Sequence, residues 1–307
     1  MQQDGCLFDI DCATKLFSSI FVRGWFHHPT EKLARVSLSC SGLIAQDTHV
    51  GLPHAGVAAF GPDKGFELQI LRTHADFDPD TVLCFTTDSG RLVQVLLLTL
   101  TTQSLNRGVT NALIPQFREK LPKPCRLLDI GGRDRSGVDR SRMFPDCDVT
   151  VLDIVEGQNV DVVGDAHKLS RYFPPEHFDA TFSVSVFEHL MMPWKVVLEM
   201  NKVMKTGGMG FVFTHQTLGM HDLPWDFWRY SDNAWKALFN ARTGFRILAT
   251  AMDRPQFILP LYFSMDKQKA EMAAGFEGSA VLFTKTGPAS EAWRTEIEDI
   301  DNTEYPH

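Results

Sequence analysis

The sequence predicts two domains, a small β-sandwich followed by a parallel α/β sheet. Its 307 residues correspond to about two domains at roughly 150 residues each. Up to residue 102, short β-type runs are separated by turn residues, which is the pattern of a sandwich. After Pro124, apolar strand-like runs alternate with helical segments, and this alternation favours a parallel sheet with helices on its faces.

The N-terminal domain, residues 1–102, is predicted from five β-type runs. Pairs such as His28-Pro29 and Ser89-Gly90 interrupt the runs, because proline and glycine favour turns over a continuous ladder. The predicted strands cover residues 20–26, 33–38, 65–71, 81–86 and 92–100.

The second domain, residues 103–290, opens with a predicted helix over 105–121, interrupted at Pro115. A helix over 194–205 ends before Gly207-Gly208, the residue type favoured just past a helix. The final residues, 291–307, are acidic and weakly patterned, and a mobile tail is expected there. The predicted strands of this domain cover residues 125–130, 149–154, 160–163, 178–183, 209–214, 245–251 and 280–284.

Composition and charge argue against several classes of protein. The formal net charge of −8 repels phosphate backbones, so nucleic acid is not an expected partner. The apolar runs are far shorter than the roughly 20 residues that cross a bilayer, so no membrane span is expected. Near the N-terminus, acidic residues stand where a signal peptide would need a basic and then an apolar region. Six cysteines without a Cys-x-x-Cys pair favour reduced thiols over a structural metal. A cytoplasmic protein is therefore expected, of an oligomeric state that the sequence does not indicate.

Three acids follow three successive predicted strands of the second domain. Asp129 ends the first strand and is followed by glycines, which let backbone N–H groups approach a ligand closely. Asp153 lies 24 residues later, about the spacing that brings a carboxylate to a ribose diol, and Asp165 follows the third strand. Because parallel strands end at the same edge of a sheet, the sequence predicts a nucleotide-type pocket there.

The segment of residues 125–238 resembles the class I S-adenosylmethionine-dependent methyltransferases. Asp129 and Gly131 match the first motif of that family, although arginines stand at 133 and 135 where further glycines are usual. Asp153 matches the ribose acid, Asp165-Ala166 the adenine contact, residues 187–190 the fourth-strand motif, and residues 199–208 the helix and turn before the fifth strand. The resemblance implies a Rossmann-like sheet and S-adenosylmethionine as cofactor.

The resemblance also implies which residues contact the cofactor. NAD is the rival cofactor, but the loop from Gly131 to Gly137 lacks the G-x-G-x-x-G spacing that seats a pyrophosphate, and Asp134 would repel it. A sulfonium cofactor carries no phosphate and tolerates nearby acids. The implied cofactor residues are Asp129, Gly131, Gly132, Arg133, Asp153, Ile154, Asp165, Ala166 and Ser183.

Residues 221–231, rich in aromatic side chains, form a second informative segment. They resemble the His-x-x-Pro-x-Asp-Phe-Trp-Arg-Tyr stretch of methyltransferases found among bacterial cell-surface polysaccharide genes. Insertions after the fifth strand roof the active site in this fold, so Trp225, Asp226, Trp228 and Arg229 are predicted to hold the acceptor. The alternative is a hydrophobic plug with an internal pair between Asp226 and Arg229.

The predicted reaction is methylation of a sugar hydroxyl in a polysaccharide or its precursor. One general base suffices, and His221 is the first candidate, followed by Glu188 and His215, because imidazole titrates near neutral pH. A metal is not predicted, although assistance by a divalent metal through His221 and Asp222 stays open. Glu188 and His215 also have purely structural interpretations, the start of a helix and a hydrogen-bonded histidine. The N-terminal domain is expected to position an acceptor polymer.

Two alternatives to this function remain open. The acceptor could be a small metabolite or a carboxylate, which Arg229 would serve equally well. The protein could also be a non-catalytic scaffold, because Arg133 and Arg135 are bulkier than the usual glycines and could fill the cofactor pocket. Both arginines could otherwise be surface charges or contacts to the methionine carboxylate, and Asp153 could be a solvated residue at the end of its strand.

Overall fold

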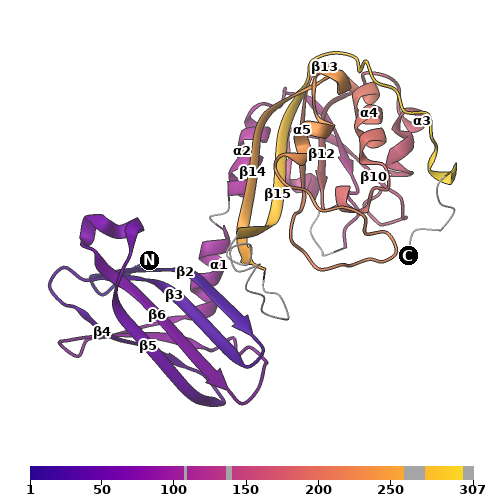
Figure 1. Cartoon of the computed structure of the whole chain (residues 1–307). Helices are drawn as coiled ribbons and strands as arrows, with labels where there is room; N and C mark the ends of the chain where they lie inside the picture. Colours follow the sequence, from indigo (N-terminus) through magenta and orange to yellow (C-terminus); the bar gives the residue numbers. More distant parts are fainter. Residues whose placement is uncertain (107–108, 136–139, 259–273, 300–307) are drawn as a thin grey trace, which may run out of the picture. The chain divides into compact units, whose positions relative to one another are not determined.

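The structure, a computed structural model, describes residues 1–106, 109–135, 140–258 and 274–299 (Figure 1). It divides into two compact units, Met1–Arg107 and Gly108–His307. The division lies close to the predicted boundary at residue 102. Across the described residues, no helix combines the length and the apolar character needed to span a membrane.

The first unit contains two antiparallel sheets, ordered β1-β2-β3-β6-β5 and β4-β7-β8 (Figure 1). A 3-10 helix covers Ala55–Phe60, and helix α1 covers Leu97–Asn106. The strands are β1 (Gln2–Gln3), β2 (Cys6–Leu16), β3 (Ser19–His27), β4 (Leu33–Ser39), β5 (Leu43–Pro53), β6 (Asp63–Arg72), β7 (Val82–Thr87) and β8 (Leu92–Leu96).

The two sheets of this unit share one hydrophobic core. Ile20, Val22 and Phe26 alternate along β3 with more exposed residues, the period-two pattern of a strand with one face in the core. Phe8 of the larger sheet and Phe85 of the smaller sheet have ring centroids 5.0 Å apart. The predicted β domain is therefore present as two antiparallel sheets around a common core.

Parts of the first unit differ from the prediction. Strands β1, β2 and β5 are additional. No residue of β5 is fully buried, so this strand has no core-facing apolar side that a sequence pattern could reveal. Residues 97–100, predicted as the end of a strand, begin helix α1. Leu97 and Leu100 are buried there while Leu98 is exposed, which is helical spacing. A short apolar run does not by itself distinguish a strand from a helix.

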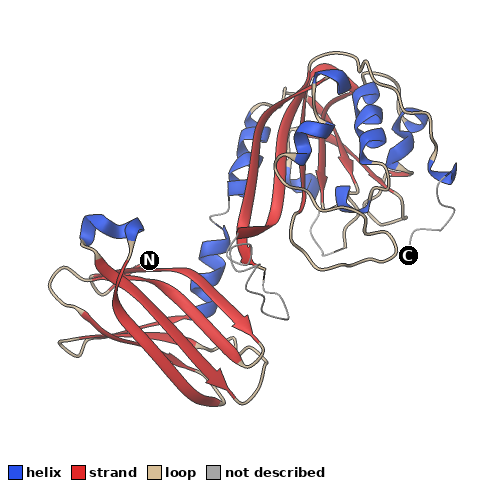
Figure 2. Cartoon of the chain, viewed as in Figure 1, coloured by secondary structure: helices blue, strands red, loops and turns tan. Residues whose placement is uncertain are grey.

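The second unit is built on a seven-stranded sheet ordered β11-β10-β9-β12-β13-β15-β14 (Figure 2). Strand β15 runs antiparallel to both of its neighbours, and the other neighbouring pairs are parallel. All seven predicted strands are present, the first with the predicted bounds. They are β9 (Cys125–Ile130), β10 (Cys147–Asp153), β11 (Val162–Val163), β12 (Phe178–Val184), β13 (Met204–His215), β14 (Phe245–Phe257) and β15 (Ala274–Lys285).

Helices cover both faces of this sheet. Leu127 of β9 packs in the cluster that contains Phe117 of α2, whereas its neighbour Leu128 packs in the cluster that contains Val197 of α4. Such two-sided burial is typical of a parallel sheet. The helices are α2 (Val109–Glu119), α3 (Leu169–Tyr172), α4 (Pro193–Val203) and α5 (Ala234–Leu238), with 3-10 turns at Arg140–Met143, Ala166–Lys168, Phe187–His189, Ala241–Thr243 and Ile297–Asp299.

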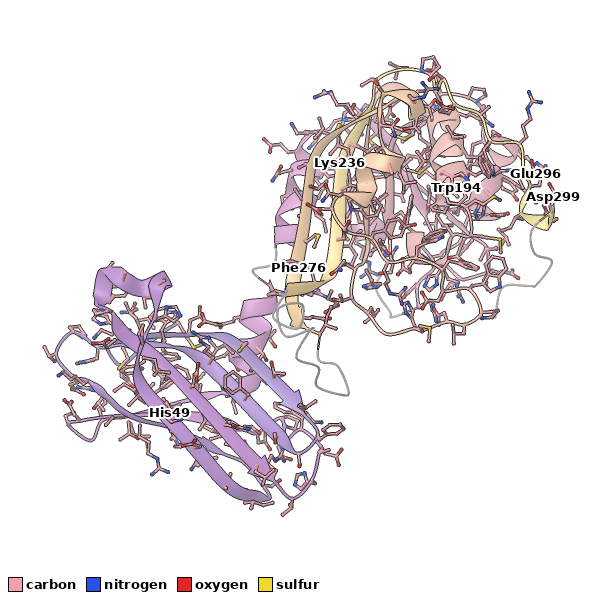
Figure 3. The ribbon with its side chains drawn as sticks, viewed as in Figure 1. His49, Trp194, Lys236, Phe276, Glu296 and Asp299 are labelled. Carbon is pink, nitrogen blue, oxygen red and sulfur yellow. The ribbon has the colours of Figure 1, made fainter. Side chains whose placement is uncertain are left out.

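The segment predicted as a mobile tail is attached to the second unit over residues 291–299 (Figure 3). Ile297 is buried against Met192. Glu296 pairs with Lys195 at 2.9 Å, and Glu298 pairs with Lys168. The acidic composition therefore serves ion pairs with basic residues of the unit, which a reading of local sequence does not detect. Residues 300–307 lie outside the described part.

Candidate functional site

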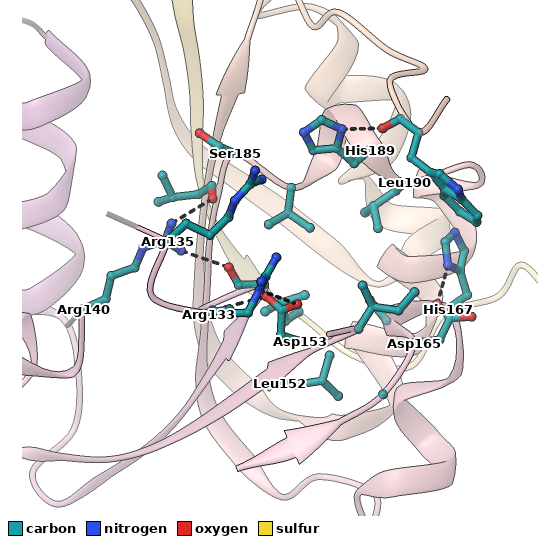
Figure 4. Close-up of a pocket in the computed structure, with 18 residues that line it drawn as sticks. Arg133, Arg135, Arg140, Leu152, Asp153, Asp165, His167, Ser185, His189 and Leu190 are labelled. Atoms are coloured by element: carbon teal, nitrogen blue, oxygen red, sulfur yellow. Dashed lines mark hydrogen bonds and ion pairs between the residues drawn. The ribbon is translucent and has the colours of Figure 1, made fainter. Parts of the chain in front are cut away.

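A cavity of about 270 Å³ lies at the carboxyl ends of β9, β10 and β12, the edge at which the acids were expected (Figure 4). Three parallel strands end there, so their loops converge on one space. Six of the nine predicted cofactor residues line it, namely Gly131, Arg133, Asp153, Ile154, Asp165 and Ala166.

The other three predicted cofactor residues lie behind the cavity lining. Asp129 is 1% exposed, and burial raises the pKa of its carboxyl to about 6. A Cβ on Gly132 would lie 2.5 Å from Asp129 Oδ2, so the glycine turn is packed directly on this acid. The Ser183 hydroxyl donates to the carbonyl oxygen of Ile130 at 3.1 Å. These residues shape the loop that borders the cavity.

The loop after β9 takes a conformation that favours glycine. Gly131 has φ +72°, and a Cβ there would lie 2.2 Å from Val186. Asn159 fastens the loop, because its amide donates to the carbonyl oxygen of Gly132 and its Oδ1 accepts from the Asp134 N–H, both at 2.8 Å. Arg140 donates weakly to the carbonyl oxygens of Gly131 and Val184.

Asp153 ends β10 with its carboxylate toward the cavity (Figure 4). Its oxygens accept backbone N–H groups from Arg133 at 3.3 Å and Val155 at 3.0 Å. The Arg133 Nε lies 3.7 Å from the same carboxylate. A carboxylate has about four lone-pair sites, so Asp153 retains capacity for two hydroxyl donors.

Asp165 and His167 form the far wall of the cavity (Figure 4). Asp165 caps the 3-10 turn at Ala166–Lys168 and accepts from the His167 N–H. The His167 Nδ1 lies 2.7 Å from Asp165 Oδ1, and its Nε2 accepts from the Met192 N–H at 3.2 Å. The histidine thus connects the β11 loop to the start of α4 and fixes the width of the cavity.

The three candidates for the general base come together beside this cavity. One ligand-type atom from each of Glu188, His215 and His221 lies within 4.8 Å of the other two. Glu188 is fully buried, with its Oε1 3.4 Å from His215 Nε2 and its Oε2 accepting from Thr214. Ser185 lines the cavity, and its hydroxyl lies 3.3 Å from His215 Nε2. The polar cluster of Glu188, His215 and His221 therefore adjoins the cavity.

The local environment shifts the pKa values of two ionisable groups in and around the polar cluster. Burial lowers the pKa of His215, which favours its neutral imidazole. The guanidinium of Arg135 binds Asp222 at 2.6 Å and lowers the pKa of that carboxyl. His189 lines the cavity, with its Nε2 3.9 Å from Glu188 Oε1 and its Nδ1 hydrogen-bonded to the carbonyl of Trp225 (Figure 4).

The predicted acceptor residues divide into two groups. Trp225 lines the cavity. Asp226 instead binds the Arg229 guanidinium at 2.6 and 2.9 Å, and this contact lowers the pKa of Asp226 to about 2. The Trp228 indole donates to the carbonyl oxygen of Leu190 at 2.9 Å. The internal pair of the alternative interpretation is thus present, beside a tryptophan that does reach the cavity.

Backbone hydrogen bonds fasten residues 225–230 to the end of β12 and β13. The carbonyl oxygen of Glu188 accepts from the N–H groups of Phe227 at 2.8 Å and Trp228 at 3.1 Å. Tyr230 donates its N–H to the His215 carbonyl and its hydroxyl to the Phe187 carbonyl. These bonds hold the polar cluster and Trp225 in one arrangement.

The sequence interpretation missed four polar residues of the cavity wall. His167 follows Asp165 by two residues, and His189 follows Glu188 directly, so a wider window around each motif would have included both. Arg140 and Ser185 reach the cavity through tertiary folding, Ser185 at φ +56°. Their local sequence carries no signal for that role.

Comparisons with known proteins identify part of the second unit. Residues 140–212 match a family described as Methyltransferase domain. A search of curated proteins finds no match.

Similar solved structures include a SAM-dependent methyltransferase from Archaeoglobus fulgidus, with 16% identity, TM-score 0.41, and 62% of this chain and 100% of that chain covered. A candidate methyltransferase from Bacillus halodurans C-125 has 17% identity and a TM-score of 0.43, with 59% of this chain and 100% of that chain covered. A third similar structure is the 1,6-didemethyltoxoflavin-N1-methyltransferase of Burkholderia thailandensis, solved with 1,6-didemethyltoxoflavin and S-adenosylhomocysteine. It has 14% identity and a TM-score of 0.42, with 58% of this chain and 78% of that chain covered.

The cavity residues suit S-adenosylmethionine. Asp153 has acceptor capacity for a ribose diol, and the neighbouring Ile154 presents a side chain that is 40% exposed, an apolar surface for a flat base. Carboxylates at Asp153 and Asp165 are compatible with a cofactor that bears a positive charge and no phosphate. Residues 140–212, which match the methyltransferase-domain family, thus carry part of this cavity, and S-adenosylmethionine is its cofactor.

Proposed function

We propose that the protein transfers a methyl group to a hydroxyl of a sugar in a cell-surface polysaccharide or its precursor. The observation that carries this proposal is the polar cluster of Glu188, His215 and His221 beside the cofactor cavity. A hydroxyl must lose its proton during methylation, and the cluster offers carboxylate and imidazole groups that can accept one.

The transfer is an in-line displacement that depends mainly on alignment. S-adenosylmethionine, when bound, supplies a methyl carbon activated by the adjacent sulfonium. With the cofactor bound, the acceptor oxygen would displace the sulfur from this carbon, and the hydroxyl proton would pass to His221, with Glu188 and His215 as the other candidates. Asp226 Oδ2 lies 3.7 Å from His221 Nδ1 and stabilises the positive charge that His221 gains.

Trp225 and Trp228 support a sugar acceptor, because aromatic faces pack against the apolar faces of sugar rings. Trp225 lines the cavity, and Trp228 is 38% exposed. Asp226 and Arg229 hold the segment through their ion pair. Its resemblance to a stretch of polysaccharide-associated methyltransferases is the basis for the polymeric acceptor.

We also propose that the unit of residues 1–107 is a small β-sandwich that positions the acceptor polymer. Its two antiparallel sheets around a common core support the sandwich. Its role in acceptor binding follows from its place in a chain whose second unit carries the methyl-transfer site.

Labelled methyl donor tests the acceptor class. The full-length protein is incubated with methyl-labelled S-adenosylmethionine and either glycan extracts or small-molecule pools. We expect label in glycans, and a His221→Gln variant that transfers label at least tenfold more slowly while S-adenosylhomocysteine affinity changes less than twofold. Label found only in low-mass products without sugar would refute the glycan acceptor, and absence of transfer in every pool would favour a scaffold.

A further inference from the structure

The polar cluster contains a buried carboxylate oxygen that lacks a hydrogen-bond partner. Glu188 is 0% exposed, and among the described residues nothing donates to its Oε1. Imidazole nitrogens face this atom, His215 Nε2 at 3.4 Å and His189 Nε2 at 3.9 Å. Leaving a buried carboxylate oxygen unpaired is costly, so the arrangement suits a positive group placed between the carboxylate and the imidazoles.

We propose that Glu188, His215 and His221 bind a divalent transition-metal cation. Their ligand-type atoms lie within 4.8 Å of one another. Ligands of a tetrahedral site with bonds of about 2.1 Å are about 3.4 Å apart, which is the distance between Glu188 Oε1 and His215 Nε2. A small inward movement of His221 completes three ligands. The proposal departs from the expectation that the chain holds no metal.

Hydrogen bonds outside the cluster already orient its members. The second oxygen of Glu188 accepts from the Thr214 hydroxyl. His221 Nδ1 lies 3.0 Å from the carbonyl oxygen of Gly219, and an N–H donated there leaves Nε2 without a proton, the form of imidazole that binds a metal. Such outer contacts are the usual support of metal-binding histidines and carboxylates.

Two other carboxylates near the cluster are already occupied. The set of His189, His221 and Asp226 has the same compactness, but both oxygens of Asp226 accept from the Arg229 guanidinium. Asp222, the partner for His221 that the sequence left open, binds Arg135 at 2.6 Å. Glu188 is therefore the carboxylate best placed to serve a cation.

The ligand set selects the kind of cation. Two imidazoles and one carboxylate suit Zn²⁺ and the neighbouring transition metals, whereas Mg²⁺ and Ca²⁺ prefer sites built from oxygen atoms. Three protein ligands also leave a position open for water or an acceptor oxygen. A coordinated hydroxyl ionises more readily. With the cation bound, His221 would act as a ligand rather than as the base, and the acceptor proton would pass to solvent. This consequence rests on the proposed function, whereas cation binding does not.

Metal binding to the untagged, metal-stripped, full-length protein tests the proposal. Titration calorimetry with Zn²⁺ and then with Mg²⁺, without cofactor or acceptor, is expected to show one Zn²⁺ site and no Mg²⁺ binding at millimolar concentration. Glu188→Gln, His215→Gln and His221→Gln should each weaken Zn²⁺ binding at least tenfold. His49→Gln serves as the matched control, because this exposed histidine belongs to β5 of the first unit and pairs there with Asp47. The Zn²⁺ affinity of this variant should stay within twofold of wild type.

Two results would overturn the proposal. One is the absence of a Zn²⁺ site in the wild-type chain, and the other is a site whose affinity survives both Glu188→Gln and His221→Gln. Circular dichroism and S-adenosylhomocysteine binding verify that each variant is folded. The metal titration contains no acceptor, so its result does not depend on glycan methylation. A failure of glycan methylation in the labelling experiment would count against the proposed function and not against the metal site.

Discussion

Substitution of Asp153 by asparagine tests the cofactor site at one atom. Asp153 uses two N–H donors, from Arg133 and Val155, and keeps about two acceptor positions for the ribose hydroxyls. Asparagine has the same shape, but it removes the charge and turns one oxygen into a donor. A hydrogen bond to a charged group contributes about 1.5–3 kcal/mol. We therefore expect Asp153→Asn to weaken S-adenosylhomocysteine binding by about 2 kcal/mol, roughly 30-fold in Kd.

Isothermal titration with S-adenosylhomocysteine measures this loss, and Asp161→Asn is the matched control. Asp161 also accepts a backbone N–H, from Val151 at 2.8 Å, but it lies outside the cavity lining. The control should keep its Kd within twofold. An equal Kd for Asp153→Asn and wild type would refute the assignment of Asp153 to the ribose, as would an equal loss in both variants.

Three further predictions concern stability and domain function. The folded state raises the pKa of Asp129 from 3.8 to about 6, so it holds this proton to higher pH than the unfolded state. The stabilisation that this group contributes is complete below pH 4 and falls by about 3 kcal/mol as the pH rises through 6. In Asp129→Asn, the free energies of unfolding measured in urea at pH 4.5 and 7 should therefore differ less than in the wild type. An unchanged pH dependence would contradict the burial argument. Arg229→Ala leaves the Asp226 carboxylate, 1% exposed, with the His221 N–H as a donor but without its guanidinium partner. This change should lower the unfolding free energy by about 2 kcal/mol, and a denaturation midpoint equal to wild type would contradict it. A chain that begins at Gly108 should bind S-adenosylhomocysteine within twofold of the full chain but lose activity on long glycans, and full activity on polymers would remove the N-terminal unit from acceptor binding.

The sheet and its acids were predictable from sequence because their signals are local. Strand β9 is a buried apolar run with a turn after it, and Asp153 and Asp165 follow strands at the expected spacing. The strand order also predicts where these acids lie, because the carboxyl ends of parallel strands meet at the same edge of a sheet. That part of the cavity is a direct consequence of chain order.

The remaining parts of the site depend on contacts between distant segments. Whether Arg229 faces an acceptor or Asp226 is decided by a hydrogen-bond geometry that the motif does not encode. Asp129 was expected among the cofactor contacts, but its carboxylate lies beneath the glycine turn rather than in the cavity lining. The acidic segment around Ile297 shows the same limit, since its basic partners lie about a hundred residues earlier.

The attachment of residues 225–230 to the Glu188 turn has a consequence for engineering. Main-chain groups of Phe227 and Trp228 share the Glu188 carbonyl, and Tyr230 holds the carbonyls of Phe187 and His215. The aromatic segment and the turn of Phe187–His189 thus form one exchangeable module rather than two independent loops. Grafting the aromatic segment alone from another enzyme would displace the turn that carries Glu188, so a change of acceptor is better attempted by replacing both pieces together or by side-chain changes at Trp225.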